Sequence, residues 1–255
     1  MNNINVLPIF NQAAPGIWED FLRIRAFAMR HIYNHHVSHA ETVALRNEYE
    51  LNWRRRGFNF AFGAYDGTDL IGFVNGDCCD RVATIRGLYV LPECMSKHVG
   101  STLLKSAENT GAIAARELDL VSLLKSRGFY EHNGYTPIMH GSNRYSKKIR
   151  NRVQCKTVPV FYSIPSFTRA CRQISVFNKT EFNPGMINQE HTPMFAYLDV
   201  DSIPQGFAFT DDATTSRAYV AQHQPTDFIA KRLHRACNAW IAAYKQINNK
   251  TNGSR

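Results

Sequence analysis

The chain has 255 residues, of which 44% are hydrophobic and 20% are charged, and its formal net charge is +9. These values are ordinary for a globular protein and allow one large domain or two small ones. No stretch has the 18 uninterrupted apolar residues of a membrane span, and the N-terminus lacks the pattern of a signal peptide. The six cysteines show neither metal-site spacing nor a dense disulfide pattern, so we expect reduced thiols in a cytoplasmic protein.

The positive charge is compatible with nucleic acid, an anionic membrane surface or an anionic small molecule. Its densest stretches are residues 54–56 and 147–152. We find no interleaving of aromatic and basic residues of the kind that single-strand binders use, so we rank nucleic acid low. A generally basic surface accounts for most of the excess, and we expect no membrane partner.

Helical and extended patterns alternate along the first 150 residues. Helical patterns occur at four places, residues 15–33, 39–54, 100–115 and 124–133. Extended runs occur at six, residues 58–65, 69–76, 84–91, 118–123, 135–139 and 142–149. Ser38 and Glu41 have the spacing of a capping box at the start of the second helix. Asp66-Gly67, between the first two extended runs, predicts a β-hairpin.

This order of elements predicts an α/β (α+β) fold, in which helices flank a mixed, mostly antiparallel sheet. The basic run 147–152 marks a boundary between a domain of residues 1–150 and a C-terminal region of residues 151–255. The second region is expected to be a smaller α/β unit. Three roles stay open for it, a second domain, a lid over the binding site of the first domain, or a dimerisation element, and the last would make the protein a homodimer.

Within residues 151–255 the pattern predicts strands followed by a helix near 226–247. The expected strands are residues 158–164, 172–178, 194–200, 206–210 and 217–221. The helix is expected to bury one apolar stripe, formed by Phe228, Leu233, Ala236, Trp240, Tyr244 and Ile247.

Residues 88–108 carry the clearest chemical signal. An apolar strand stops at Pro92, a short polar loop follows, and Gly100 opens a helix. The first amides of a helix lack internal partners and its dipole adds positive charge, so such a turn can hold a diphosphate. Lys97 and His98 add donors, while Ser101 and Thr102 add hydroxyls. A strand, loop and helix joined at a glycine also connect many α/β units, so both interpretations stay open from these residues alone.

The same segment resembles the acetyl-CoA loop of the GNAT superfamily of N-acetyltransferases. In that family a Pro-Glu is followed by Arg/Gln-x-x-Gly-x-Gly/Ala and by paired leucines. Pro92-Glu93, Gly100 and Leu103-Leu104 match the pattern. Met95 stands where Arg or Gln is usual, and His98 stands where the first glycine is usual.

A second segment is similar to a later signature of the family, in which a Phe-Tyr pair precedes x-x-x-Gly-Phe/Tyr. Phe129-Tyr130 and Gly134-Tyr135 have this spacing. The two signatures stand in the family's order, and the resemblance covers about residues 5–150. It implies a GNAT-like sheet and an acetyl-CoA-binding domain in residues 1–150.

The resemblance implies an enzyme that moves an acetyl group from acetyl-CoA, its co-substrate, to a primary amine of a small-molecule or peptide acceptor. The amine attacks the thioester directly, strand amides polarise the carbonyl, and Tyr130 is the implied general acid to the CoA thiolate. The implied CoA-binding residues are Leu88, Tyr89, Val90, Met95, Ser96, Lys97, His98, Val99, Gly100, Ser101, Thr102, Ser122 and Phe129. Some family members place a glutamate base where Thr84 stands, so we assign no base.

Two alternatives accompany this hypothesis. The departures at Met95 and His98 suit a degenerate GNAT-fold binding module with weak or no CoA binding and no catalysis. Separately, His31, His35 and His39 have spacing that would place them on one helical face, as zinc ligands can be. No cysteine or paired carboxylate completes such a set, so we assign no metal. In the GNAT fold the turn between the first two helices borders the acceptor site, so a histidine that lines this site or acts as the base is an alternative. We favour an exposed polar connection.

Overall fold

A computed structural model describes residues 4–9, 17–55, 60–79, 82–111, 115–149, 156–160, 194–198, 204–210, 216–221 and 226–253. These residues divide into two compact units, one ending at Ile149 and the other beginning at Lys156. The strand expected at 172–178 lies outside the described residues, as does the end of the basic run 147–152.

The N-terminal unit is built on a seven-stranded sheet with the order β1-β2-β3-β4-β5-β7-β6. Its strands are β1 (Ile4–Pro8), β2 (Phe60–Asp66), β3 (Asp69–Cys79), β4 (Val82–Val90), β5 (Glu117–Val121), β6 (Thr136–Pro137) and β7 (Arg144–Lys148). Only the pairing of β4 with β5 is parallel. The mixed, mostly antiparallel sheet expected from the sequence is therefore confirmed, and β1 is an addition that the pattern did not indicate.

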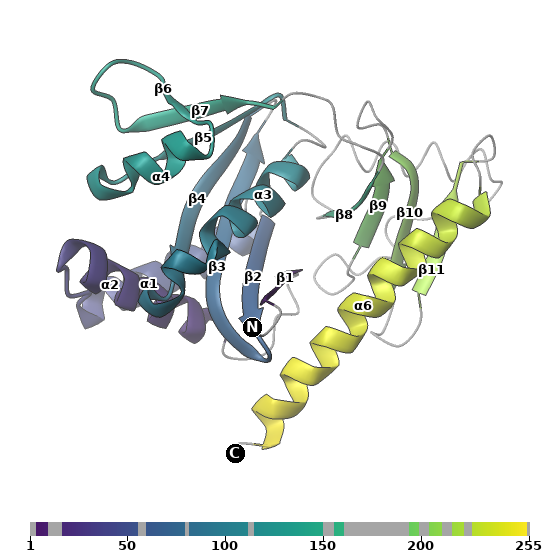
Figure 1. The fold of residues 1–255 in the computed structure, drawn as a ribbon. Helices are drawn as coiled ribbons and strands as arrows, with labels where there is room; N and C mark the ends of the chain where they lie inside the picture. The colour runs from purple at the N-terminus through teal and green to yellow at the C-terminus, as the bar shows by residue number, and fades with distance from the viewer. Residues whose placement is uncertain are drawn as a thin grey trace. The chain divides into compact units, whose positions relative to one another are not determined.

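Helices cover both faces of this sheet (Figure 1). They are α1 (Ile17–Tyr33), α2 (His39–Arg55), α3 (Val99–Gly111) and α4 (Arg127–His132), with the short 3₁₀ turns η1 (Pro92–Lys97) and η2 (Leu124–Ser126). On one face, the ring of Phe21 in α1 stacks on Phe73 of β3 at 3.9 Å. On the other, Leu103 of α3 lies against Gly72, the neighbour of Phe73. Since successive strand residues point to opposite faces, α1 and α3 lie on opposite sides of the sheet.

The two local turn signals in the sequence are confirmed. The hairpin between β2 and β3 turns at Asp66 and Gly67, and Gly67 has a φ of +63°. At the start of α2, Glu41 donates its backbone N–H to Ser38 Oγ at 3.2 Å, and Ser38 N–H donates to Glu41 Oε2 at 2.7 Å. These reciprocal bonds satisfy two helix-end donors, as a capping box does. The pKa of the Glu41 carboxyl is lowered, because hydrogen bonds from the Ser38 backbone N–H, the Ser38 side chain and His35 favour its charged form.

Replacing Ser38 with alanine should destabilise the N-terminal unit by about 1 kcal/mol, since the Glu41 amide loses its acceptor at the helix end. The measurement is the free energy of unfolding from urea titration of the full chain. Ser106→Ala is the control, because the Ser106 hydroxyl donates within helix α3, to Thr102 O. An equal loss in both variants would show that the cap contributes nothing specific.

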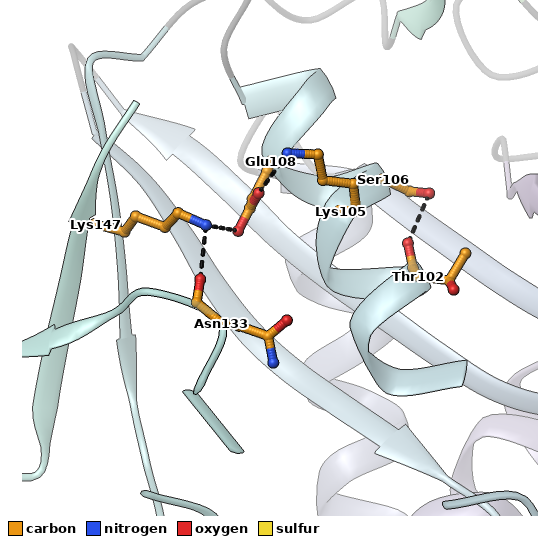
Figure 2. A network of polar contacts seen from close by, with 6 residues as sticks. All are labelled: Thr102, Lys105, Ser106, Glu108, Asn133 and Lys147. Carbon is orange, nitrogen blue, oxygen red and sulfur yellow. Dashed lines mark hydrogen bonds and ion pairs between the residues drawn. The ribbon is translucent and has the colours of Figure 1, made fainter. Parts of the chain in front are cut away.

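A partly buried ion pair joins α3 to strand β7, next to the edge of the sheet (Figure 2). Lys147 Nζ of β7 lies 2.7 Å from Glu108 Oε1 of α3 and 2.8 Å from the carbonyl oxygen of Asn133. Lys105 Nζ reaches the second Glu108 oxygen at 3.4 Å. The Lys147 ammonium also lies 5.2 Å from the centre of the Tyr135 ring. Helix α3 is thus held to the α4–β6 turn and to β7 by a single network.

The C-terminal unit is a four-stranded antiparallel sheet with the order β11-β10-β9-β8, packed against the long helix α6. Its elements are β8 (Lys156–Val160), β9 (Met194–Leu198), β10 (Pro204–Thr210), β11 (Ser216–Val220) and α6 (Thr226–Gly253). A smaller C-terminal α/β unit is therefore confirmed. Its described cysteine, Cys237, is a free thiol, as are Cys78 and Cys94 of the first unit.

The buried stripe of α6 differs from the expected one. Leu233 and Trp240 are buried as expected, but Phe228 is 49% exposed. The stripe instead runs through Ile229, Leu233, Cys237, Trp240 and Ile241. The expectation for Phe228 was wrong because this phenylalanine lies at the edge of the interface, with its ring beneath the Arg232 guanidinium at 4.7 Å. Among the described helices, none is long and apolar enough to cross a membrane.

Candidate active site

A cavity of about 360 Å³ opens where β4 and β5 diverge. The two strands pair in parallel from Val82 and Glu117 as far as Ile85 and Leu120. Beyond this point two segments line the cavity, β4 from Ile85 to Val90 and the β5–α4 segment from Val121 onward. The end of α1 and the η1–α3 loop complete its walls. The site is therefore a slot between two strands that have separated.

A bulge in β4 marks the point of separation. Asn75 and Gly76 of β3 oppose Gly87 and Ile85, so Arg86 is an extra residue on β4. Past the bulge, Leu91 donates its N–H to Ile71 O on the β3 side at 2.8 Å. Alternate residues of a strand direct their backbone groups to opposite neighbours, so the N–H groups of Val90 and Leu88 face the side that β5 has left. The cavity wall thus carries strand amides directed toward it.

Tyr130, on the short helix α4, lines the cavity and is only 8% exposed. Burial, and to a smaller extent the neighbouring Tyr89 and Tyr33, raise the pKa of the Tyr130 phenol above its usual value of 10.0. The Asn133 side chain caps this helix by donating to Phe129 O at 2.8 Å, and Gly134 leaves it with a φ of +85°. A protonated, buried phenol therefore lines the same cavity as Leu88 and Val90 of β4.

The loop between β4 and α3 has an uncommon backbone. His98 ends η1 in the left-handed conformation, with φ 59° and ψ 12°. Its carbonyl oxygen accepts the backbone N–H and the hydroxyl of Thr102, each at 3.0 Å, and so opens α3. A Cβ on Gly100 would lie 3.2 Å from Phe129 Cζ, so only a glycine lets this ring pack against the first turn without a shift. A glycine would also adopt the conformation of residue 98 without strain.

A family model described as an acetyltransferase (GNAT) domain matches residues 58–137. The matched range begins just before β2 and contains the diverging strands, the η1–α3 loop and Tyr130. The N-terminal unit contains a GNAT domain. The matched family is one of acetyltransferases, and the match does not extend to the C-terminal unit.

Among solved structures, a GNAT-family acetyltransferase from Staphylococcus aureus is similar, with a TM-score of 0.49 and 16% identity over 58% of this chain and 100% of that chain. The PaiA N-acetyltransferase from Thermoplasma acidophilum, in complex with coenzyme A, has a TM-score of 0.47 and 23% identity over 57% and 99%. A Brucella melitensis GNAT-family acetyltransferase in complex with acetyl-CoA has a TM-score of 0.42 and 13% identity over 59% and 90%. No curated protein matches the chain.

The GNAT domain brings about half of the sequence-derived site residues together in the cavity wall. These are Leu88, Tyr89, Val90, Met95, Gly100, Phe129 and Tyr130. The others lie on the loop and first turn outside it. Ser96, Lys97, His98 and Thr102 are exposed, Ser101 is half-buried and Val99 is buried. Ser122 faces elsewhere, since its hydroxyl donates to Leu123 O at 3.0 Å.

The sequence did not indicate the residues by which the N-terminal unit closes the cavity from the α1 side. Tyr33 Oη lies 2.7 Å from Ser126 Oγ, and Lys125 Nζ donates to Ile32 O at 2.7 Å. Other lining residues that carried no signal are Ala28, Met29, Ile85, Arg86, Gly87, Val121 and Leu123. The two bonds join the end of α1 to η2, so both elements are fixed around one site.

The histidines of the α1–α2 connection do not share a helical face in the N-terminal unit. Helix α1 ends at Tyr33, and Asn34 follows with a φ of 53°. His35 Nε2 instead lies 3.1 Å from Glu41 Oε1, while His31 and His39 are exposed. In the part of the chain that the structure describes, no three metal-binding side chains gather in one place.

Proposed function

We propose that the GNAT domain transfers the acetyl group of acetyl-CoA to a primary amine by direct attack. The observation that carries this proposal is the position of Tyr130, buried in the slot between β4 and β5 within the range that matches the acetyltransferase family. The residues of the slot suit a thioester. Apolar walls accept the pantetheine arm, strand amides face the reacting carbonyl, and a protonated phenol lies beside them.

In this proposal the N–H groups of Leu88 and Val90 polarise the thioester carbonyl. As the amine nitrogen bonds to the carbonyl carbon, negative charge grows on the oxygen, and fixed donors in a water-poor slot stabilise it. The C–N bond forms, the C–S bond breaks, and the sulfur leaves as a thiolate. The proton released by the amine nitrogen passes to water, since no base is assigned.

Tyr130 completes the step by protonating the thiolate. Burial raises the pKa of the phenol, so Tyr130 keeps its proton at neutral pH. The same apolar surroundings disfavour a charged thiolate, so a thiolate formed in the slot is a stronger base than it is in water. The η1–α3 loop and the first turn of α3 would hold the diphosphate, with Lys97 and Ser101 as donors.

His98 is the position at which the loop departs most from the family. We expect His98→Gly to tighten acetyl-CoA binding about fivefold, equivalent to about 1 kcal/mol, by removing a Cβ beside the diphosphate. Relief of the left-handed backbone at residue 98 should instead increase the stability of the free protein. His98→Asn is the matched control, because asparagine tolerates this backbone but keeps the Cβ. Calorimetric titration of both variants separates the two effects. Weaker binding in His98→Gly would instead identify the imidazole as a ligand-binding group.

The altered loop favours a second function, a GNAT-fold binding module with weak or no CoA binding. Met95 and His98 occupy the positions where the family has Arg or Gln and glycine. A screen of acetyl-CoA consumption with small amines, amino acids and peptides separates the two functions. Turnover of any amine supports the enzyme, while no turnover together with weak or no acetyl-CoA binding supports the module. Within the enzyme proposal, residues 1–150 hold the catalytic machinery and residues 151–255 modulate acceptor choice or association.

A further inference from the structure

The cavity wall carries an uneven charge. Among the described residues that line it there are two cations, Arg86 and Lys125, and no carboxylate. The carboxylate beside Arg86 is Asp77, which accepts a hydrogen bond from the Arg86 Nε at 2.8 Å and does not itself line the cavity. Glu41, at the start of α2, is engaged by Ser38 and His35. Arg86 is thus paired with a carboxylate just outside the cavity, whereas Lys125 bonds to a backbone carbonyl and keeps its positive charge uncompensated in the cavity wall.

These cations lie on the α1 face of the sheet, opposite the η1–α3 loop. Lys125 donates one of the three N–H groups of its ammonium to Ile32 O of α1 and keeps two for a ligand. Arg86 bonds to Asp77. Asp77 lies on the same face of β3 as Phe73, whose ring packs against Phe21 of α1. Arg25, a third cation, extends from α1 over the ring of the lining residue Tyr89 at 5.5 Å, and its Nε is buried without a hydrogen-bond partner. The positive charge thus belongs to the side away from the diphosphate loop.

Apolar side chains line the cavity beside these cations. Val121 and Leu123 line the cavity and are still 61% and 46% exposed. Exposed aliphatic side chains at the mouth of a cavity favour a ligand that covers them with an apolar group. An acceptor that enters here meets aliphatic walls and ammonium or guanidinium donors together.

We infer that the acceptor is a primary amine on an apolar molecule that also carries a carboxylate, such as an amino acid with an apolar side chain. The inference rests on the proposed acetyl transfer and names its acceptor class. Lys125, with N–H groups beyond the one bonded to Ile32, binds the carboxylate, and Arg86, although paired with Asp77 through its Nε, adds further N–H donors to the cavity wall. The same cations repel a second ammonium group, so polyamines and lysine-rich peptides are poor acceptors. They also lower the pKa of the attacking amine, which increases its neutral, nucleophilic fraction.

The test compares matched acceptors on the full chain: L-phenylalanine, its decarboxylated analogue phenethylamine, and spermidine. We expect kcat/KM to be about tenfold higher for phenylalanine than for phenethylamine, the usual effect of one hydrogen bond to a charged group. Lys125→Met should raise the KM for phenylalanine about tenfold and affect phenethylamine much less, while Lys125→Arg should retain most of the preference. If Lys125 acts only structurally, through its bond to Ile32, Lys125→Met should lower kcat/KM equally for both acceptors.

Titration of acetyl-CoA into the same samples keeps this inference distinct from the proposed function. If acetyl-CoA does not bind, the proposed function fails and the inference falls with it. If acetyl-CoA binds and spermidine or phenethylamine is the better acceptor, the acceptor class alone is overturned. Binding without acetylation of phenylalanine, or an equal loss for both acceptors in Lys125→Met, also overturns it.

Discussion

Replacing Tyr130 with phenylalanine is expected to lower kcat about 100-fold, the usual effect of removing a general acid. The change deletes only the hydroxyl of a buried ring, which packs edge-on against Phe129 and Tyr135. The packing therefore persists, and the affinity for acetyl-CoA should stay close to that of the wild type. Steady-state kinetics together with calorimetric titration measure the two quantities separately.

The matched control is Tyr135→Phe. Tyr135 is buried even more completely than Tyr130, which it neighbours, but it is not among the residues that line the cavity. Its variant should retain most of kcat. If Tyr130→Phe keeps full turnover, Tyr130 has no part in proton transfer, although the fold would be unaffected. An equal fall in both variants would point to packing rather than to proton donation.

The pH dependence gives a further check on Tyr130. Because burial raises the pKa of its phenol above 10.0, the hydroxyl stays protonated throughout the neutral and mildly alkaline range. We therefore expect no loss of kcat below pH 10 that depends on Tyr130. A wild-type profile that falls between pH 8 and 10, and that loses this fall in Tyr130→Phe, would contradict the assignment.

Replacing Lys147 with methionine is expected to destabilise the N-terminal unit by about 2 kcal/mol. The substitution keeps an apolar stem but leaves the Glu108 carboxylate, whose side chain is 10% exposed, without its nearer cation. Breaking a fully buried pair costs about 3 to 5 kcal/mol. The expected effect is smaller here because Lys147 is 28% exposed and Lys105 remains near the carboxylate (Figure 2). Urea unfolding of the full chain measures the difference.

Lys105→Met is the control for this network. Lys105 is 67% exposed and lies 3.4 Å from Glu108 Oε2, so its removal should cost less than about 0.5 kcal/mol. The double variant Lys147→Met with Glu108→Gln should recover part of the loss, because no buried charge is left unpaired. Equal effects of the two lysines, or no recovery in the double variant, would show that burial of Glu108 is not the source of the stability.

Features of this fold that depend on a few neighbouring residues could be predicted from the sequence. The capping box of Ser38 and Glu41 and the hairpin at Asp66-Gly67 are set by local backbone chemistry, and both are present. Strand β1 was missed because Ile4–Pro8 is short and ends in a proline, which weakens the extended pattern. The stripe on α6 was misplaced at Phe228 because helical spacing alone does not show where an interface ends.

The candidate site divides in the same way. Its loop and its tyrosine carry short sequence signatures, and they lie close together along the chain. The α1 side of the cavity carries no such signature, because Tyr33 and Ser126, which meet there, are 93 positions apart in the sequence. The sequence likewise did not indicate the left-handed backbone of His98, although it shows that the usual glycine is replaced there. Contacts that tertiary folding creates between distant polar residues leave no periodic or spacing signal.

Calorimetric titration of acetyl-CoA into the full chain tests the central claim most directly. The proposed function predicts saturable binding by one site per chain, with a dissociation constant below about 1 mM, the upper end of the usual range for enzyme substrates. It also predicts that Gly100→Val weakens this binding, because a side chain there would displace Phe129 from the cavity wall. The absence of binding heat up to millimolar acetyl-CoA, in a chain that unfolds cooperatively, would contradict the account.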